Sequence, residues 1–131
     1  MTSRAAVVNG PYTRPVADGT EVKRNRLLKL DSSGNAVYAG TSGDAVVGVS
    51  DNDMSANAAD RVRGNSITVV PLNHEGQLRM TASAAIGVGV ELGIAADGKV
   101  AAGTGLGFVN ISDGISTDGH VLTAVPITKI P

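Results

Sequence analysis

LLKLDSSGNAVYAGTSGDAVVGV, residues 27–49, is the stretch that decides the fold of this chain. Leu28 and Leu30 stand on either side of a lysine, which is the period of a strand with one buried face. The turn-forming residues DSSGN follow at 31–35, and AVYA runs back at 36–39. The pattern therefore predicts a hairpin.

A second turn and several further strands follow the hairpin. TSGD at 41–44 leads into AVVGV at 45–49, whose β-branched residues predict a strand buried on both faces. Residues 55–62 allow two alternatives, two turns of helix or a loop with one helical turn. SITVVPL at 66–72 alternates and predicts a strand that ends at its proline, and 78–81 predicts a returning strand.

The same pattern recurs later in the chain. ELGIAADGKVAAGTGLG at 91–107 repeats the hairpin, and LTAVPI at the end of the chain matches ITVVPL. We interpret this as a degenerate internal duplication with units at 27–72 and 91–127; two unrelated hairpins with common turn residues are the alternative. With a deletion of one residue, the matched pairs are Leu28 and Leu92, Leu30 and Ile94, Gly34 and Gly98, Val37 and Val100, and Gly40 and Gly103.

Length and composition limit the core. The 131 residues fit one β-rich domain at 21–131 preceded by an extended arm at 1–20. With 17 glycines and only Tyr12, Tyr38 and Phe108 as aromatic residues, the core must consist of small aliphatic side chains. Such a core buries little apolar area in a monomer, so we expect oligomerisation or docking on a larger surface.

The N-terminal segment cannot fold by itself. MTSRAAVVNGPYTRPVADGT, residues 1–20, has Pro11 and Pro15 beside a short apolar run. Prolines block ladder hydrogen bonds and helix interiors, so we predict an extended arm or an edge strand. A disordered terminus is the alternative for the isolated molecule. Both hold if the arm becomes ordered by adding a strand to a partner's sheet.

Charge and composition argue against several classes of protein. The net charge of −1 disfavours a nucleic-acid binder, and the basic groups at 23–26 and at Arg61 and Arg63 lack interleaved aromatic residues, as solvated turns or rims do. The absence of cysteine excludes a disulfide framework and thiolate chemistry. Without a sustained apolar run we expect neither a signal peptide nor a membrane span, and we expect synthesis in the cytoplasm.

Motifs for metal and nucleotide binding are incomplete. Asp51, Asp53 and Ser55 have the first three ligand spacings of a calcium loop, but alanine and valine stand where the turn glycine and the bidentate glutamate belong. GTGLG at 103–107 looks like part of a nucleotide loop, yet Phe108 occupies the third glycine position and no helix signal follows. We predict no metal and no cofactor.

The sequence contains no convincing catalytic group. His74 and His120 both fall in predicted turns, so exposed polar residues are the default interpretation. No serine lies in a nucleophile-elbow context, and no two carboxylates stand out as an acid and a base. We predict that the chain is not an enzyme.

The first unit resembles the head decoration, or capsid cement, proteins of tailed bacteriophages. In that family an apolar strand ending in an Asp-Ser-Ser type turn leads to a valine strand, a turn of threonine, glycine and aspartate, and an Ala-Val-Gly strand. LLKLDSSGNAVYAGTSGDAVVGV, a polar loop and ITVVPL follow the same order here. The resemblance covers about residues 26–72 and, more loosely, the second unit.

The resemblance implies a fold and a set of partners. The fold would be mainly β, a small β-barrel or β-tulip-like domain. The chain would be made in the host cytoplasm and would stand as a homotrimer on the outer capsid surface of the virion, with its arm augmenting strands of the major capsid protein. Neither nucleic acid nor membrane is an expected partner. The candidates for shell contact, chosen by their position in the arm, are Arg4, Val7, Tyr12 and Arg14.

Two other classes remain open. A trimeric receptor-binding or fibre-tip module is also small and β-rich, but it would expose aromatic side chains for sugar stacking, and this chain has few. A small enzyme would use His74 or His120. Replacing both histidines with alanine separates an enzyme from a decoration protein, because a decoration protein would still bind shells.

Overall fold

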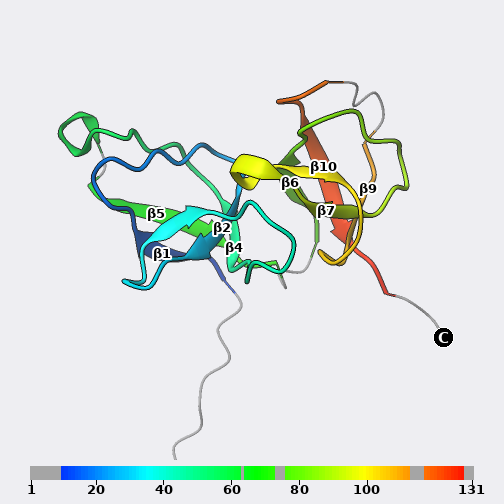
Figure 1. The fold of residues 1–131 in the computed structure, drawn as a ribbon, viewed down its shortest axis with the longest axis horizontal. Coiled ribbons are helices and arrows are strands. Elements are labelled where there is room, and N and C mark those ends of the chain that lie inside the picture. Colours follow the sequence, from blue (N-terminus) through cyan, green and yellow to red (C-terminus); the bar gives the residue numbers. More distant parts are fainter. Residues whose placement is uncertain (1–9, 63, 73–75, 113–116, 129–131) are drawn as a thin grey trace, which may run out of the picture.

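The computed structural model describes residues 10–62, 64–72, 76–112 and 117–128. They form a mainly β structure of two lobes that lie side by side (Figure 1), so the predicted fold class is confirmed. No helix among these residues is long and apolar enough to span a membrane. The strands and 3₁₀ turns are β1 (Tyr12–Pro15), β2 (Leu27–Leu30), β3 (Ala36–Tyr38), β4 (Gly48–Ser50), η1 (Ala58–Asp60), β5 (Ser66–Val70), β6 (Leu78–Thr81), β7 (Leu92–Ile94), η2 (Ala96–Gly98), β8 (Val100–Ala102), β9 (Phe108–Asn110) and β10 (Val121–Pro126).

The two lobes have the same strand order. Lobe 1, residues 10–72, is an antiparallel sheet with the order β1-β5-β4-β2-β3. Lobe 2, residues 76–128, pairs β6-β10-β9 and β7-β8, and an antiparallel bridge between Glu91 and Val109 places β7 beside β9. The order β6-β10-β9-β7-β8 therefore repeats that of lobe 1. In lobe 2 a parallel bridge between Ala82 and Val100 also joins the residue after β6 to β8, whereas no bridge among the described residues joins β1 to β3 in lobe 1.

Hydrogen bonds outside the strands repeat as well. The Asn52 Oδ1 atom accepts a bond from the Thr68 N–H at 3.1 Å, and the Ser112 Oγ atom accepts one from the Thr123 N–H at 2.8 Å at the equivalent place in lobe 2. Two unrelated hairpins with common turn residues would not share hydrogen bonds between distant segments, so the two lobes are a structural repeat. Equivalent backbone bonds run from Ser50 to Arg26 and Asn110 to Val90, and from Ala39 to Leu27 and Gly103 to Glu91.

The alignment of the two hairpins differs from the prediction at one point. Leu30 pairs with Ala36 in lobe 1, and Ile94 pairs with Val100 in lobe 2, so both connections contain five residues. The predicted deletion is therefore wrong: Val100 is equivalent to Ala36 and not to Val37, and Gly103 is equivalent to Ala39 and not to Gly40. Ladder register decides which side chain faces the core, and both Ala36 and Val100 are fully buried.

Two aspartates hold the turns of the first hairpin and of the loop that follows it. The Asp31 Oδ1 atom accepts the N–H groups of Ser33 and Asn35, both at 2.9 Å. The Asp44 carboxylate accepts those of Gly40 at 2.9 Å and Thr41 at 3.0 Å, which lowers its pKa to about 2. Short polar side chains at these spacings replace backbone turn bonds, which is why the pattern was visible in the sequence.

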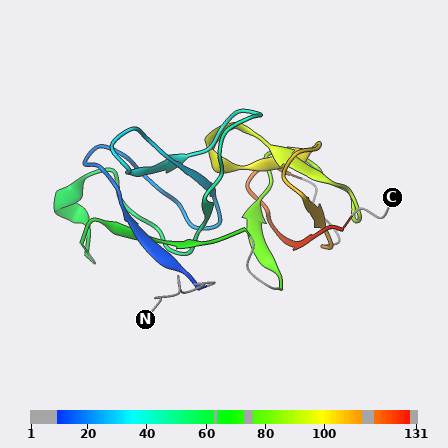
Figure 2. The same cartoon turned by 90° about the horizontal axis from the view of Figure 1, so that it is seen from below.

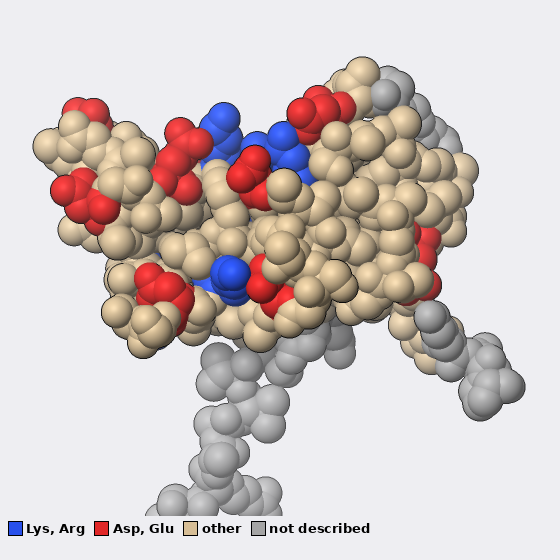
Figure 3. Space-filling model, viewed as in Figure 1, with Lys and Arg blue, Asp and Glu red and all other residues tan. Residues whose placement is uncertain are grey.

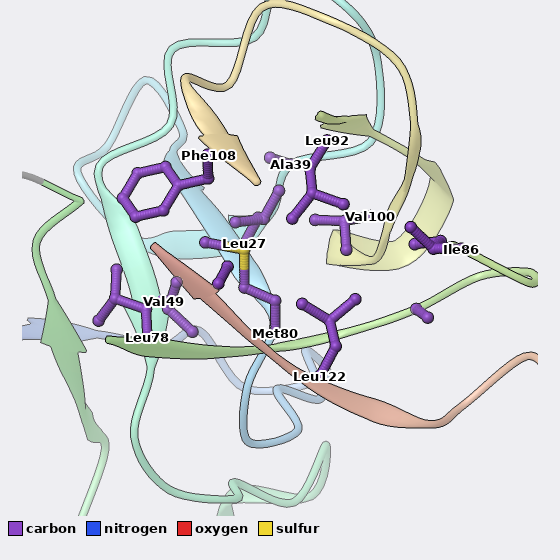
Figure 4. Packing of buried hydrophobic residues seen from close by; sticks show 12 residues of the cluster. Leu27, Ala39, Val49, Leu78, Met80, Ile86, Leu92, Val100, Phe108 and Leu122 are labelled. Atoms are coloured by element: carbon purple, nitrogen blue, oxygen red, sulfur yellow. The ribbon is translucent and has the colours of Figure 1, made fainter. Parts of the chain in front are cut away.

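The sheet of lobe 1 is buried on both faces. One face covers a core of its own, and the other closes the core of lobe 2 (Figure 4). Leu28 faces the first core and Leu27 the second, whereas Leu30 is 37% exposed. The predicted burial of Leu30 is therefore wrong: Leu30 lies on the same face of β2 as Leu28, but the lobe 1 core does not enclose it. All of β4 is buried as predicted, although it begins at Gly48 and not at residue 45.

The connecting segments follow the simpler alternatives. Only η1 forms within residues 55–62, where the Asn57 Oδ1 atom caps the N–H of Ala59 at 3.1 Å, so the loop with one turn is confirmed. Strand β5 ends before Pro71, and β6 is the predicted returning strand. Part of the predicted arm is β1, at the edge of the lobe 1 sheet, and residues 1–9 lie outside the described residues.

Candidate contact surfaces

The open edge of strand β1 offers few backbone N–H donors. The Val16 N–H donates to the Asn65 carbonyl at 2.7 Å. In an antiparallel ladder, the backbone N–H groups of successive residues point alternately toward the paired strand and away from it. The backbone of Arg14 therefore bonds to β5, whereas the backbone positions of Thr13 and Pro15 face the open edge of the sheet. Proline has no N–H, so this edge is a poor template for a further strand. The prediction of an edge strand from its prolines is confirmed for β1.

Tyr12 and Arg14 fasten β1 to the rest of lobe 1. The Tyr12 hydroxyl donates to the Val47 carbonyl at 2.9 Å, and burial raises its pKa, an effect that the nearby Arg14 charge reduces. The Arg14 Nε atom donates to the Gly34 carbonyl at 3.0 Å. These two predicted contact residues thus already stabilise the body. The other two predicted contact residues, Arg4 and Val7, lie outside the described residues.

Arg61 connects three segments of lobe 1. Its guanidinium makes five hydrogen bonds, which a planar group with five donors can satisfy at once. The expectation of a solvated rim is wrong for this residue, because its guanidinium bonds within lobe 1, and three of its five partners lie more than forty residues away, where no motif marks them. The acceptors are the carbonyls of Val16, Ala17, Thr20 and Ser55 and the Asn65 side chain.

The groove beside Arg61 lacks the arrangement of a metal site. It has a volume of about 290 Å³, and the Asp53 carboxylate in its wall accepts the Arg24 N–H at 2.7 Å. The Ser55 hydroxyl accepts the N–H of Asn57 at 3.3 Å. Within the described ranges, no three metal-ligating side chains come together. Asp53 and Ser55 therefore act as loop-stabilising acceptors here.

The glycine loop and His120 both belong to turns. Residues 103–107 connect β8 to β9, and Gly105 and Gly107 have φ values of +99° and +79°, so the segment is a strand connection followed by a strand. His120 is exposed, and its carbonyl accepts the Ala82 N–H at 2.8 Å. His74 lies outside the described residues.

Charged groups of both signs are interspersed on the face of the molecule shown in Figure 3. On the face in Figure 3 the Lys and Arg side chains lie among Asp and Glu, without the continuous basic area that nucleic-acid binding needs. Lys29 pairs with Asp44 at 3.2 Å, and Lys99 pairs with Asp118 at 2.7 Å. The hydrogen bond from Lys99 lowers the pKa of the Asp118 carboxyl.

The outer face of lobe 2 is apolar and accessible. Strand β10 buries Leu122 and Ala124 in the core, and the alternating residues Val121, Thr123 and Val125 face outward. Val121 is 46% exposed and Ile111, just after β9, is 42% exposed. Sequence reasoning missed this surface, although the alternation in VLTAV was a signal for it. We define the outer face of lobe 2 as Val109, Ile111, Val121 and Val125.

A comparison of the chain with models of known protein families found no match, and a comparison with curated proteins found no significantly similar sequence.

Proposed function

We propose that this chain is a capsid decoration protein of a tailed bacteriophage. It binds the outer surface of the phage head as a homotrimer and stabilises the shell by bridging subunits of the major capsid protein. The observation that carries the proposal is that residues 26–72, which resemble the decoration family, fold together as strands β2 to β5 of one lobe. Asp31 and Asp44 hold the turns of that pattern.

The architecture suits a structural role. A decoration protein needs a rigid body with an accessible contact surface, and it needs no deep pocket. Both lobes are built of β-sheets, and lobe 1 is packed on both faces. Three linked copies on one shell gain avidity, so each contact can be modest. The protein is made in the host cytoplasm and acts on the virion surface, without an enzymatic step.

The segment before β1 is the proposed strand donor. Residues 1–9 precede an edge strand, and Tyr12 and Arg14 are already bonded within lobe 1. Arg4 and Val7 are therefore the stronger candidates for the shell. An extended segment that adds a strand to the capsid protein gains main-chain hydrogen bonds at little demand on its sequence.

The test uses heads from the phage that encodes the protein, after deletion of its gene. We expect these heads to release DNA at lower temperature, and purified chain to bind them and restore stability. A version without residues 1–9 should bind much more weakly, whereas the His74→Ala, His120→Ala double variant should bind like the natural chain. Heads that bind no chain would contradict the proposal, and labelled chain at a fibre tip would favour a receptor-binding module.

A further inference from the structure

The two lobes contact each other through different surfaces. Leu27, Ala39 and Val49 on one face of the lobe 1 sheet complete the core of lobe 2. Leu27 and Met80 point toward each other at the centre of this core (Figure 4). One face of lobe 1 therefore covers the β6 side of lobe 2.

Because the two lobes are repeats, each of the two contacting surfaces has an equivalent surface on the other lobe. Glu91 and Val109 occupy in lobe 2 the positions of Leu27 and Val49, because Leu27 pairs with Val49 as Glu91 pairs with Val109. The equivalent of the covering face is thus the outer face of lobe 2. Glu91, Val109 and Val125 are partly exposed there, and Ile111 and Val121 beside them are 42% and 46% exposed.

The matching surface on lobe 1 is the side that carries β1. Ladder register makes Arg14 the equivalent of Met80, since Arg14 pairs with Ile67 as Met80 pairs with Leu122. By the same register, Tyr12 is equivalent to Leu78. This side is therefore the counterpart of the surface that lobe 1 covers on lobe 2.

The charges at the two equivalent positions are complementary. Within the chain the meeting side chains are Leu27 and Met80, both apolar. At the equivalent positions they are Glu91 and Arg14, a carboxylate and a guanidinium. The apolar pair of Leu27 and Met80 thus corresponds to a pair of opposite charges, which would attract each other across a contact between two molecules.

We propose that two copies of the chain associate head to tail. The outer face of lobe 2 of one copy docks on the β1 side of lobe 1 of the next, with Glu91 facing Arg14 and with Val109 and Val125 against Tyr12. The contact is heterologous, so its repetition closes a ring when the rotation allows it. The occupant is a second copy because the chain itself contains the template of the contact.

This contact differs from the internal one in its hydrogen bonds. Thr81 donates to the Asn25 carbonyl between the lobes, and the equivalent of Thr81 is Pro15, which has no N–H and no hydroxyl. Association between copies therefore depends on apolar contact and charge. The inference rests on the homotrimer of the proposed function and names the contact between its copies, but it does not require binding to a capsid.

The test is the mass of the full chain by light scattering over a range of concentrations. We expect a multiple of the monomer mass, and we expect Glu91→Arg and Arg14→Glu each to weaken association at least about tenfold, because like charges then meet. The double variant should restore it. Restoration by a charge exchange identifies the pair, which a general loss of stability would not do.

A second pair of variants guards against misfolding, since Arg14 also bonds Gly34. Val125→Asp on the outer face of lobe 2 should weaken association, and Val62→Asp, at a side chain that is 98% exposed on lobe 1, should not. A chain that stays monomeric, or an assembly unaffected by Glu91→Arg and Val125→Asp, would overturn the inference. A chain that associates in this way but fails to bind heads would contradict only the proposed function.

Discussion

The backbone carbonyl of Asn25 accepts two hydrogen bonds from Thr81, one from its N–H and one from its hydroxyl, both at 3.0 Å. These bonds join a turn of lobe 1 to the outer edge of β6 in lobe 2. Thr81 is only 4% exposed, so water does not compete freely for the carbonyl. The two lobes are therefore linked by polar bonds at the margin of their shared apolar core.

Replacing Thr81 with valine should weaken this link. The variant keeps the shape and the N–H bond but loses the hydroxyl bond, so the free energy of unfolding should fall by about 1 kcal/mol. Urea unfolding measures the change. Thr13→Val, at an exposed position of β1, is the matched control and should have little effect. Equal losses in the two variants would show that the Thr81 hydroxyl bond contributes nothing specific.

Asp44 should make stability depend on pH. Its pKa in the folded chain is about 2, below its ordinary value of 3.8, because the N–H groups of Gly40 and Thr41 bond the charged form. Its contribution is therefore present above about pH 4 and disappears as the pH falls through about 2. Asp44→Asn should unfold at a lower temperature than the natural chain at pH 7, and the difference should shrink toward pH 2. A difference that stays constant with pH would refute this assignment.

Arg61 should be irreplaceable by lysine. A lysine has one ammonium group and cannot reach acceptors in three segments at once, so Arg61→Lys should lower the free energy of unfolding by about 1–2 kcal/mol. Hydrogen exchange should also accelerate at residues 16–20. Arg79→Lys, on the exposed side of β6, provides the control. If the lysine variant were as stable and as protected as the natural chain, the network would be incidental.

The two equivalent turn glycines should differ in their tolerance of alanine. Gly34 and Gly98 have φ values of +83° and +71°, so alanine is strained at both. At Gly98 the new Cβ would lie 2.7 Å from the Leu27 carbonyl oxygen, whereas at Gly34 it would meet the mobile end of Arg14. We expect losses of about 3 kcal/mol for Gly98→Ala and about 1 kcal/mol for Gly34→Ala by thermal unfolding. The reverse order would contradict the packing of η2 on β2.

The turns and the repeat could be predicted because their signals are local. Asp31, Gly34 and Asp44 act within five residues of their own position, so spacing alone revealed the hairpin and the turn that follows it. The closing strands matched for the same reason, since alternation is a property of a single strand. The register of the second hairpin was misjudged because matching Val100 to Val37 by residue type ignored the pairing with Ile94.

The candidate contact surfaces were harder to predict from the sequence. The arm was located by its prolines, yet the use of Tyr12 and Arg14 within lobe 1 depends on the carbonyls of Val47 and Gly34, which lie far along the chain. The role of Arg61 likewise depends on acceptors more than forty residues away. No pattern of residue types specifies such partners.

The sequence by itself determined a small β protein with two similar units, because turn chemistry and alternation act over a few residues. Only the tertiary structure decided which faces of the two sheets are buried. Leu27 is fully buried because lobe 2 packs on its face of β2, whereas Leu30, on the opposite face, lies outside the lobe 1 core and is partly exposed. Glu91, the equivalent of Leu27 in lobe 2, is partly exposed beside Val109. The burial of a sheet face depends on how the two lobes pack on each other. That packing joins residues that are distant in sequence, so no local pattern reveals it.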